Sequence, residues 1–334
     1  MQGLILLDKP EGLTSFAAVA RVRRIFGEKR AGHTGTLDPM ATGVLPILLG
    51  RATRVSSLML ESDKRYLARV RLGITTDTLD VTGEVLSERD VFVSDSALEA
   101  ACGRFRGEIK QVPPMYSALK KDGVRLYDLA RSGVEVEREA RAVTIKRLDI
   151  LERDGDEFVM DVLCSKGTYI RSLAADIGEA LGCGAALSSL RRTFTAGFDI
   201  ADCVTLDELE ANAEAHLLPA DRCLRFMPKA TVTDKQRDRF LHGGELSLDR
   251  VGIDAADVAK TADVAKTAGV AKTAGAGNNE VGRADDSAGA ADSTADPTNG
   301  ETPFVRVYSR AGELLGLGRL DGGELKVHCI LYEG

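Results

Sequence analysis

The sequence predicts a mixed α+β domain with a largely antiparallel sheet flanked by helices, followed by a small β-rich domain. Strand-like alternation and helical periodicity both occur before residue 222, without a regular strand–helix–strand repeat. Short alternating segments separated by turn residues return after residue 303. A low-complexity stretch precedes them. We therefore place the two domains at 1–222 and 223–334, with an insertion at 251–301 in the second.

The elements of the first domain follow from their periodicity. The strands that we expect lie at 4–7, 66–72 and 158–164. Thr14 or Ser15 can cap a helix whose apolar residues recur at helical spacing until Gly27, where it ends. A second helix covers 170–181 and ends at Gly182. In the 66–72 strand, Tyr66 belongs to the apolar face and the arginines to the other.

The second domain has its own signals on both sides of the insertion. Residues 230–246 are helix-like and contain a glycine pair near their end. Residues 304–331 alternate, with turns at Ala311-Gly312 and Asp321-Gly322-Gly323. The insertion repeats a six-residue Ala/Lys-rich unit and contains no aromatic residue, so it buries too little apolar surface to offset chain entropy and is expected to be disordered.

Net charge does not exclude a nucleic-acid partner. The 334 residues carry a net charge of −7, but 251–301 hold four basic and nine acidic side chains, which leaves only −2 for the rest. No run approaches the roughly 18 apolar residues of a membrane span, and the N-terminus lacks the pattern of a signal peptide. A cytoplasmic protein that does not bind membranes is expected.

The cysteines do not indicate a metal site. Six cysteines are spread along the chain and none forms a Cys-x-x-Cys pair. Structural zinc sites use closely spaced ligand pairs. Reduced, buried thiols are therefore expected, and no metal.

The densest chemical signal is the segment GHTGTLDPMATGVLP, residues 32–46. Its glycines let the backbone turn sharply, and Pro39 restricts Asp38 to extended conformations, so a carboxylate is presented from a rigid loop. It is not a phosphate-binding loop, because no Gly-Lys-Ser/Thr follows the glycines. Spacing alone leaves two interpretations, since an Asp-Pro turn is more often only a turn than a catalytic loop.

This segment resembles the signature of the bacterial tRNA pseudouridine-55 synthase (TruB) family. Six further blocks match in family order and, with it, cover most of residues 3–200: LDKPEGLTS (7–15), KRY (64–66), TDTLDVTGE (76–84), QVPPMYSALKKDGVRLYDLAR (111–131), CSKGTYIRSLAADIG (164–178) and LSSLRRTFTAGF (187–198). The C-terminal segments resemble a PUA domain, a small β-barrel-like RNA-binding module, less strongly. The long insertion departs from the family pattern.

The resemblance implies a pseudouridine-synthase fold and an isomerase that converts uridine 55 in the T-arm of tRNA. It implies Asp38 as nucleophile or proton acceptor, paired with and kept ionised by Arg171, and Tyr66 stacked on the uracil. The target uridine must leave its stack, so His33, Tyr169 and Leu190 are expected around the extruded base. The residues expected to contact phosphates are Lys9, Arg54, Lys120, Lys121 and Arg131, and 120–139 is expected to be a mobile RNA-binding loop.

The implied chemistry needs neither redox step nor metal, so no cofactor is expected, and the partner is tRNA bound by a monomer. Three other classes remain. A non-catalytic RNA-binding protein would not need Asp38, Tyr66 and Arg171 together. A synthase working on ribosomal RNA within a guide-RNA particle is a second, against which the short N-terminus argues. A structural protein whose insertion binds partners is the third and weakest.

Overall fold

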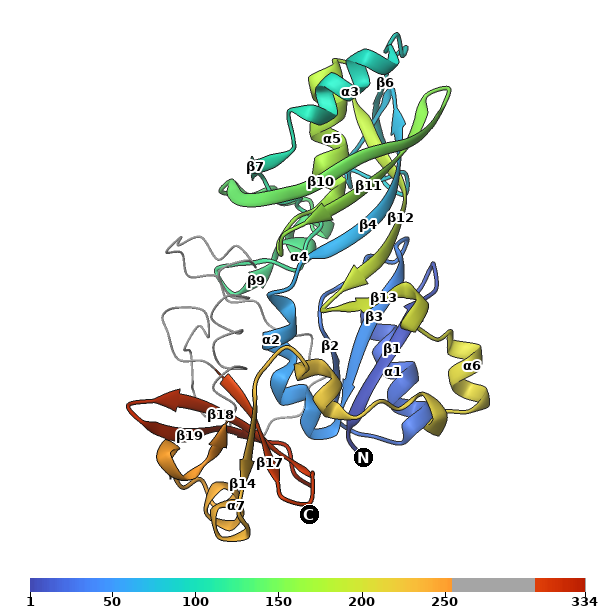
Figure 1. Cartoon of the computed structure of the whole chain (residues 1–334). Helices are drawn as coiled ribbons and strands as arrows, with labels where there is room; N and C mark the ends of the chain where they lie inside the picture. Colours follow the sequence, from blue (N-terminus) through green and yellow to red (C-terminus); the bar gives the residue numbers. More distant parts are fainter. Residues whose placement is uncertain (254–303, 334) are drawn as a thin grey trace.

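The structure is a computed structural model that describes residues 1–253 and 304–333. A long mixed sheet forms the larger part, and a second, smaller sheet lies beside one end of it (Figure 1). The path through the main sheet is β1 (Gly3–Lys9), β3 (Thr42–Leu49), β12 (Ala185–Thr195), β4 (Lys64–Leu72), β11 (Glu157–Cys164), β10 (Arg141–Asp154) and β7 (Gly107–Gln111). β2 (Ala31–His33) pairs with β3, and β13 (Phe198–Asp199) pairs with β12.

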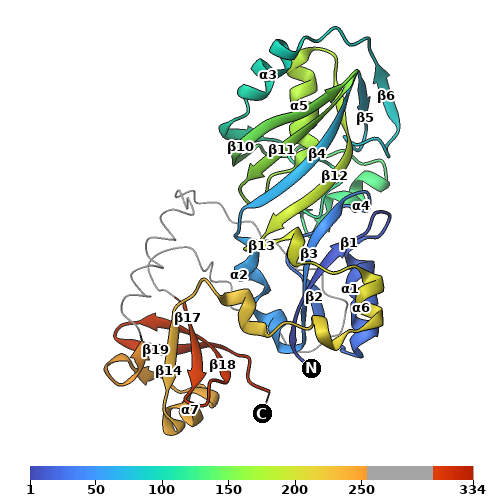
Figure 2. The same ribbon diagram turned by 45° about the vertical axis from the view of Figure 1, so that its right-hand side comes forward.

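The pairings of the main sheet are antiparallel except where β12 meets β3. Helices pack on its two halves: α5 (Ile170–Leu181) and α3 (Asp95–Gly103) on the β12–β4–β11–β10 half, and α1 (Ser15–Phe26) and α6 (Leu206–Ala211) beside β1 and β3 (Figure 2). The other α-helices and strands of this part are α2 (Ser56–Leu60), α4 (Leu126–Arg131), β5 (Ile74–Thr76), β6 (Val85–Glu88), β8 (Lys120–Lys121) and β9 (Val124–Arg125), and its short 3-10 helices include η2 (Ile200–Asp202), η3 (Glu214–His216) and η4 (Ala220–Leu224). The mixed, largely antiparallel α+β class predicted from the sequence is confirmed.

The predicted helices form where their sequence signals lie. Thr14 caps α1 by accepting a hydrogen bond from the Ala17 amide at 3.0 Å, and Gly27 ends the helix in the left-handed region with φ 60°. Gly182 ends α5 in the same way, with φ 81°. Both helices turn a buried apolar side to the sheet, which fixes where their first residues stand.

The smaller sheet runs in the order β15 (Leu246–Ser247), β19 (Glu324–Ile330), β18 (Leu314–Asp321), β17 (Phe304–Ser309), β14 (Lys229–Val232) and β16 (Gly252–Ile253), with α7 (Asp234–Leu241) beside it. The helix expected over 230–246 is therefore too long. Thr233 caps α7 through a capping box with Gln236, and the residues before it pair with β17 as a strand.

The predicted insertion begins too early. Val251 is buried in the core of the smaller sheet, and Ile253 pairs with Ala230 of β14. Residues 251–253 are too few to show the alternation of a strand, and they lie directly before the repeat, so no signal in the sequence separates them from it. The rest of the proposed insertion, from residue 254, lies outside the described residues, and so does the expectation of disorder.

The two sheets share a hydrophobic cluster. Leu4, Val44 and Phe198 of the larger part pack with Leu317 and Leu331 of the smaller one. At the same junction, the guanidinium groups of η1 (Gly50–Val55) donate hydrogen bonds to backbone carbonyls at the C-terminal end of the chain. Among the described residues, no helix has the length and apolar character needed to cross a membrane.

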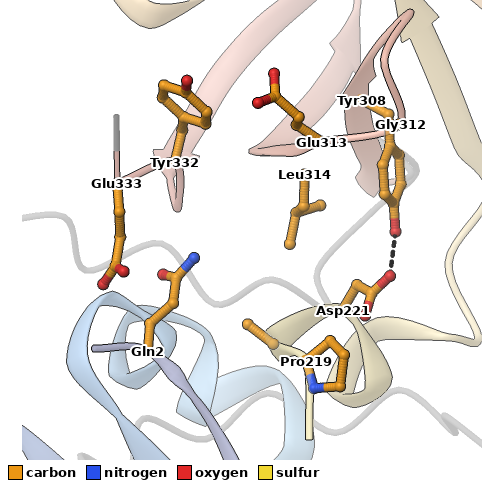
Figure 3. Close-up of a pocket in the computed structure, with 10 residues that line it drawn as sticks. Gln2, Pro219, Asp221, Tyr308, Gly312, Glu313, Leu314, Tyr332 and Glu333 are labelled. Atoms are coloured by element: carbon orange, nitrogen blue, oxygen red, sulfur yellow. Dashed lines mark hydrogen bonds between the residues drawn. The ribbon is translucent and has the colours of Figure 1, made fainter.

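A pocket of about 460 Å³ opens at this junction (Figure 3). Gln2 and Pro219 face Leu314 across it, and the Tyr308 hydroxyl donates a hydrogen bond of 2.9 Å to Asp221. Among the described residues that line this pocket, none is a predicted site residue. The pocket therefore belongs to the domain junction and not to the candidate active site.

Candidate active site

Asp38 lies in the loop between β2 and β3, and hydrogen bonds fix the backbone on both sides of it. Ser15 Oγ, in the first turn of α1, bonds both the amide and the carbonyl of Leu37 at 2.8 Å. The Gly12 amide donates to the Pro39 carbonyl at 2.8 Å. The loop is thus attached to the start of α1, and the Asp38 carboxylate keeps a 36% exposed position at its tip.

Arg171 is the partner of that carboxylate. It is the second residue of α5 and only 5% exposed, and its Nε lies 2.9 Å from Asp38 Oδ2, so the ion pair expected between them is present. Its two terminal nitrogens donate to the carbonyls of Thr78 at 2.8 Å and Tyr116 at 2.7 Å. Because all three nitrogens have acceptors, the guanidinium has a fixed orientation and holds one carboxylate oxygen.

Asp80 is a buried carboxylate that the sequence analysis did not single out. Its Oδ2 lies 3.8 Å from Arg171 Nε, and its Oδ1 accepts hydrogen bonds from the Thr78 hydroxyl at 2.9 Å and the Thr82 amide at 3.0 Å. Two carboxylates, Asp38 and Asp80, therefore flank one guanidinium. The signal that was available is the motif TDTLDVTGE itself, whose threonines surround the aspartate, but nothing in the sequence places it near α5.

Tyr66 on β4 is buried, with 6% exposure, and burial raises the pKa of its hydroxyl to about 12. Leu190 on β12 pairs in register with Ala68, two residues along the same β4 face. Tyr169 immediately precedes α5, where its backbone exchanges two hydrogen bonds with the Gln111 side chain. The roles of these three in holding a base remain predictions.

His33 ends β2 and is buried, with 8% exposure. Burial, assisted by the nearby Arg192 charge, lowers the pKa of His33 from 6.5 to about 4. Its Nδ1 has no hydrogen-bond partner within the described part of the chain. A neutral, shape-defining ring agrees with the predicted place near an extruded base, which remains a prediction.

The predicted phosphate contact of Lys9 is wrong. Its side chain is fully buried, and its Nζ donates to the carbonyls of Pro10, Leu13 and Pro39 at 2.8, 2.6 and 3.3 Å. Burial lowers the pKa of Lys9 to about 8. The ammonium group thus donates to backbone carbonyls of two loops. The sequence alone does not distinguish a lysine with this role from a lysine exposed to solvent.

The other predicted phosphate contacts are exposed. Lys120, Lys121 and Arg131 lie on the β8–β9 hairpin and α4, within the segment expected to form the RNA-binding loop. Arg54 lies instead at the domain junction, where it donates to the Ile330 carbonyl at 2.7 Å. All four contacts with phosphate remain predictions.

Comparison with known proteins decides the family. A model of the N-terminal domain of TruB family pseudouridylate synthases matches residues 23–170, and one of the C-terminal domain of tRNA pseudouridylate synthase B matches residues 171–225. The tRNA pseudouridine synthase B of Chromobacterium violaceum is 52% identical over 73% of this chain and 81% of its own length. The chain belongs to the TruB family of pseudouridylate synthases. It is therefore an isomerase, and the resemblance drawn from the sequence is confirmed.

Other relatives agree with this membership. The protein of the same name from Ralstonia nicotianae is 53% identical over 74% of this chain and 82% of its own length. Among solved structures, a Cbf5–Nop10–Gar1 complex contains a chain that is 25% identical with a TM-score of 0.68, matched over 99% of this chain and 85% of that one. The pseudouridine-synthase-like fold expected from the sequence is thus confirmed.

Proposed function

We propose that this TruB-family chain converts uridine 55 in the T-arm of tRNA to pseudouridine, with Asp38 as the reacting carboxylate. The observation that carries the proposal is the Asp38–Arg171 pair, held at 2.9 Å at the tip of a fixed loop. The name shared by relatives of 52% and 53% identity supports tRNA as the substrate. We expect the enzyme to work in the bacterial cytoplasm, where tRNA is modified, as a monomer of two domains divided near residue 222.

The isomerisation breaks the bond from C1′ to N1 of uracil, forms a bond from C1′ to C5, and moves the C5 proton away while N1 gains one. Asp38 attacks C1′ or accepts the proton at C2′, and both routes need an ionised carboxylate beside the ribose. Arg171 fixes the orientation of that carboxylate through one oxygen and leaves the other for the substrate. Tyr66 stacks on the uracil and serves in removal of the C5 proton.

The uridine reaches Asp38 only after it leaves its stack. His33 fills the space near the extruded base, and Tyr169 and Leu190 line its pocket. The exposed cations of the 120–139 segment hold the phosphates and set the register of the T-arm without reading its sequence. Recognition then depends on the folded shape of the T-arm.

The proposal is tested by incubating the protein with unmodified tRNA and mapping pseudouridine at single-nucleotide resolution. Position 55 alone should react, and Asp38→Asn should bind the same RNA but react at less than about a hundredth of the wild-type rate, because its amide neither attacks nor accepts a proton. Modification at another position, or a faster Asp38→Asn enzyme, would refute the corresponding part of the proposal.

Substrate shape is tested with an isolated T stem-loop and a linear RNA of the same loop sequence. The stem-loop should react somewhat more weakly than full tRNA, with affinity falling as salt rises, and the linear RNA should react poorly. Equal rates on both RNAs would exclude recognition by shape and leave the role of Asp38 intact.

A further inference from the structure

Arg192 on β12 is 1% exposed and has the largest of the fully buried side chains in the described structure. An ionised guanidinium is costly to bury unless its donors are satisfied. Within the described part of the chain, no carboxylate forms a salt bridge with it. A well-packed apolar side chain would fill the same space at lower cost, so the reason for an arginine must lie in the groups that its donors reach.

Those groups are backbone carbonyls on both sides of Asp38. The Nη2 atom donates to Gly35 at 3.0 Å and Nη1 to Thr36 at 3.4 Å, both ahead of the aspartate. Nε donates to the Val44 carbonyl at 2.8 Å, on the strand that follows the loop. A single planar group therefore joins the two ends of the loop that presents Asp38.

The backbone of Arg192 also joins three strands at this point. It pairs with Gly43 of β3 on one side and with Tyr66 of β4 on the other. A Cβ atom on Gly43 would lie 2.2 Å from the Arg192 carbonyl oxygen, so only glycine allows this approach. Directly paired residues project to the same face of a sheet, and both Arg192 and Tyr66 are buried, so the guanidinium and the phenol share one interior region.

We propose that Arg192 is a positioning residue that holds the Asp38 loop in register with Tyr66, so that one guanidinium sets the distance between the carboxylate and the aromatic ring that act on the same uridine. The proposal rests on the proposed function of the site. Lys cannot replace Arg192, because three different nitrogens of the planar guanidinium reach the three carbonyls, and a lysine side chain ends in a single nitrogen.

The test compares Arg192→Lys with the matched control Arg191→Lys. Arg191 is the preceding residue, is 40% exposed and pairs with Asp8. Single-turnover rates on unmodified tRNA, RNA dissociation constants and urea unfolding are measured for both variants and the wild type. Arg192→Lys should bind RNA within about threefold of wild type but react roughly 10²-fold more slowly at saturating RNA, since an ångström of misplacement has that effect. Arg191→Lys should match the wild type in all three measurements.

A purely structural role would lower stability and leave the single-turnover rate of the folded fraction unchanged. A wild-type single-turnover rate in Arg192→Lys, with or without a loss of stability, overturns the proposal. Arg192→Gln serves as a second variant, and failure of both to fold would assign Arg192 to folding alone and likewise overturn it. Absence of pseudouridine formation by the wild-type protein would instead refute the proposed function, and it is seen before any variant is made.

Discussion

Replacing Arg171 with lysine tests whether the geometry around Asp38 depends on the fork of the guanidinium or only on its charge. The three nitrogens of Arg171 reach three different acceptors: Asp38 at 2.9 Å, the Thr78 carbonyl at 2.8 Å and the Tyr116 carbonyl at 2.7 Å. A lysine keeps the charge but offers one nitrogen. It can serve Asp38 or the carbonyls, which come from different segments, but not all of them.

The magnitude follows from the contacts that are lost. Hydrogen bonds to charged groups contribute about 1.5–3 kcal/mol each, so losing two of three costs about 3–6 kcal/mol if nothing relaxes. Arg171 is 5% exposed, so little water is available to donate to the two carbonyls that would lose their hydrogen bonds. We expect the lower end for the free energy of unfolding, about 3 kcal/mol, and a rate loss of roughly 10²-fold from the displaced carboxylate.

The assay combines urea unfolding with single-turnover pseudouridine formation at saturating tRNA. Arg65→Lys is the control, because Arg65 also binds a carboxylate with two nitrogens, at 2.8 and 2.6 Å to Asp161, but is 43% exposed. The free energy of unfolding of Arg65→Lys should differ from that of the wild type by less than about 1 kcal/mol, and its single-turnover rate should equal that of the wild type. If Arg171→Lys behaves like this control, the charge alone suffices and the argument from fork geometry fails.

Three further outcomes are expected. Lys9→Met should lower the free energy of unfolding by about 1–3 kcal/mol by leaving buried carbonyls without a donor. It should leave the salt dependence of tRNA binding unchanged, whereas loss of a phosphate contact would lower that slope by about one unit. Burial lowers the pKa of His33 from its ordinary 6.5 to about 4 in the folded protein, so the unfolded chain takes up a proton first as pH falls, and stability is lost from about pH 6.5 to 4. Between pH 7 and 4.5 the free energy of unfolding of the wild type should fall by about 2.5 kcal/mol more than that of His33→Gln, as measured by urea unfolding. Equal decreases in the two proteins would show that folding does not lower the pKa of His33. Replacing residues 254–303 with a short Gly/Ser linker should keep the single-turnover rate within about threefold, because each halving of a loop's length changes its closure free energy by only about 0.6 kcal/mol. Loss of folding or tRNA binding would show that the segment contributes to either.

Elements with local signals could be predicted from the sequence. α1 and α5 have their own glycine ends, and α1 also has a threonine cap, so neighbouring residues determine where they stop. β4 shows its two faces by alternation. β16 could not be predicted, because its pairing with β14 comes from residues 20 or more positions earlier and its length is two residues.

The resemblance brought Asp38 and Arg171 together before the structure did, because both lie inside family motifs. It did not distinguish cations that face solvent from those that face carbonyls. Nothing in the residues beside Lys9 or Arg192 marks either cation as buried, and only the three-dimensional pairing of β3, β4 and β12 turns Arg192 inward. Contacts between segments some 150 positions apart leave no local pattern to read.

Several cations near the candidate site are buried, so the number of basic residues does not measure how many can contact RNA. In the described structure, Lys9, Lys64, Arg171 and Arg192 are buried, and all four donate to backbone carbonyls. Their charges fix loops around the candidate site and are not available to phosphates at the surface. Counterion release counts only the cations that meet phosphate. The salt dependence of RNA binding should therefore reflect the exposed cations of 120–131 and not the total number of basic residues, and the net charge of −7 says little about affinity.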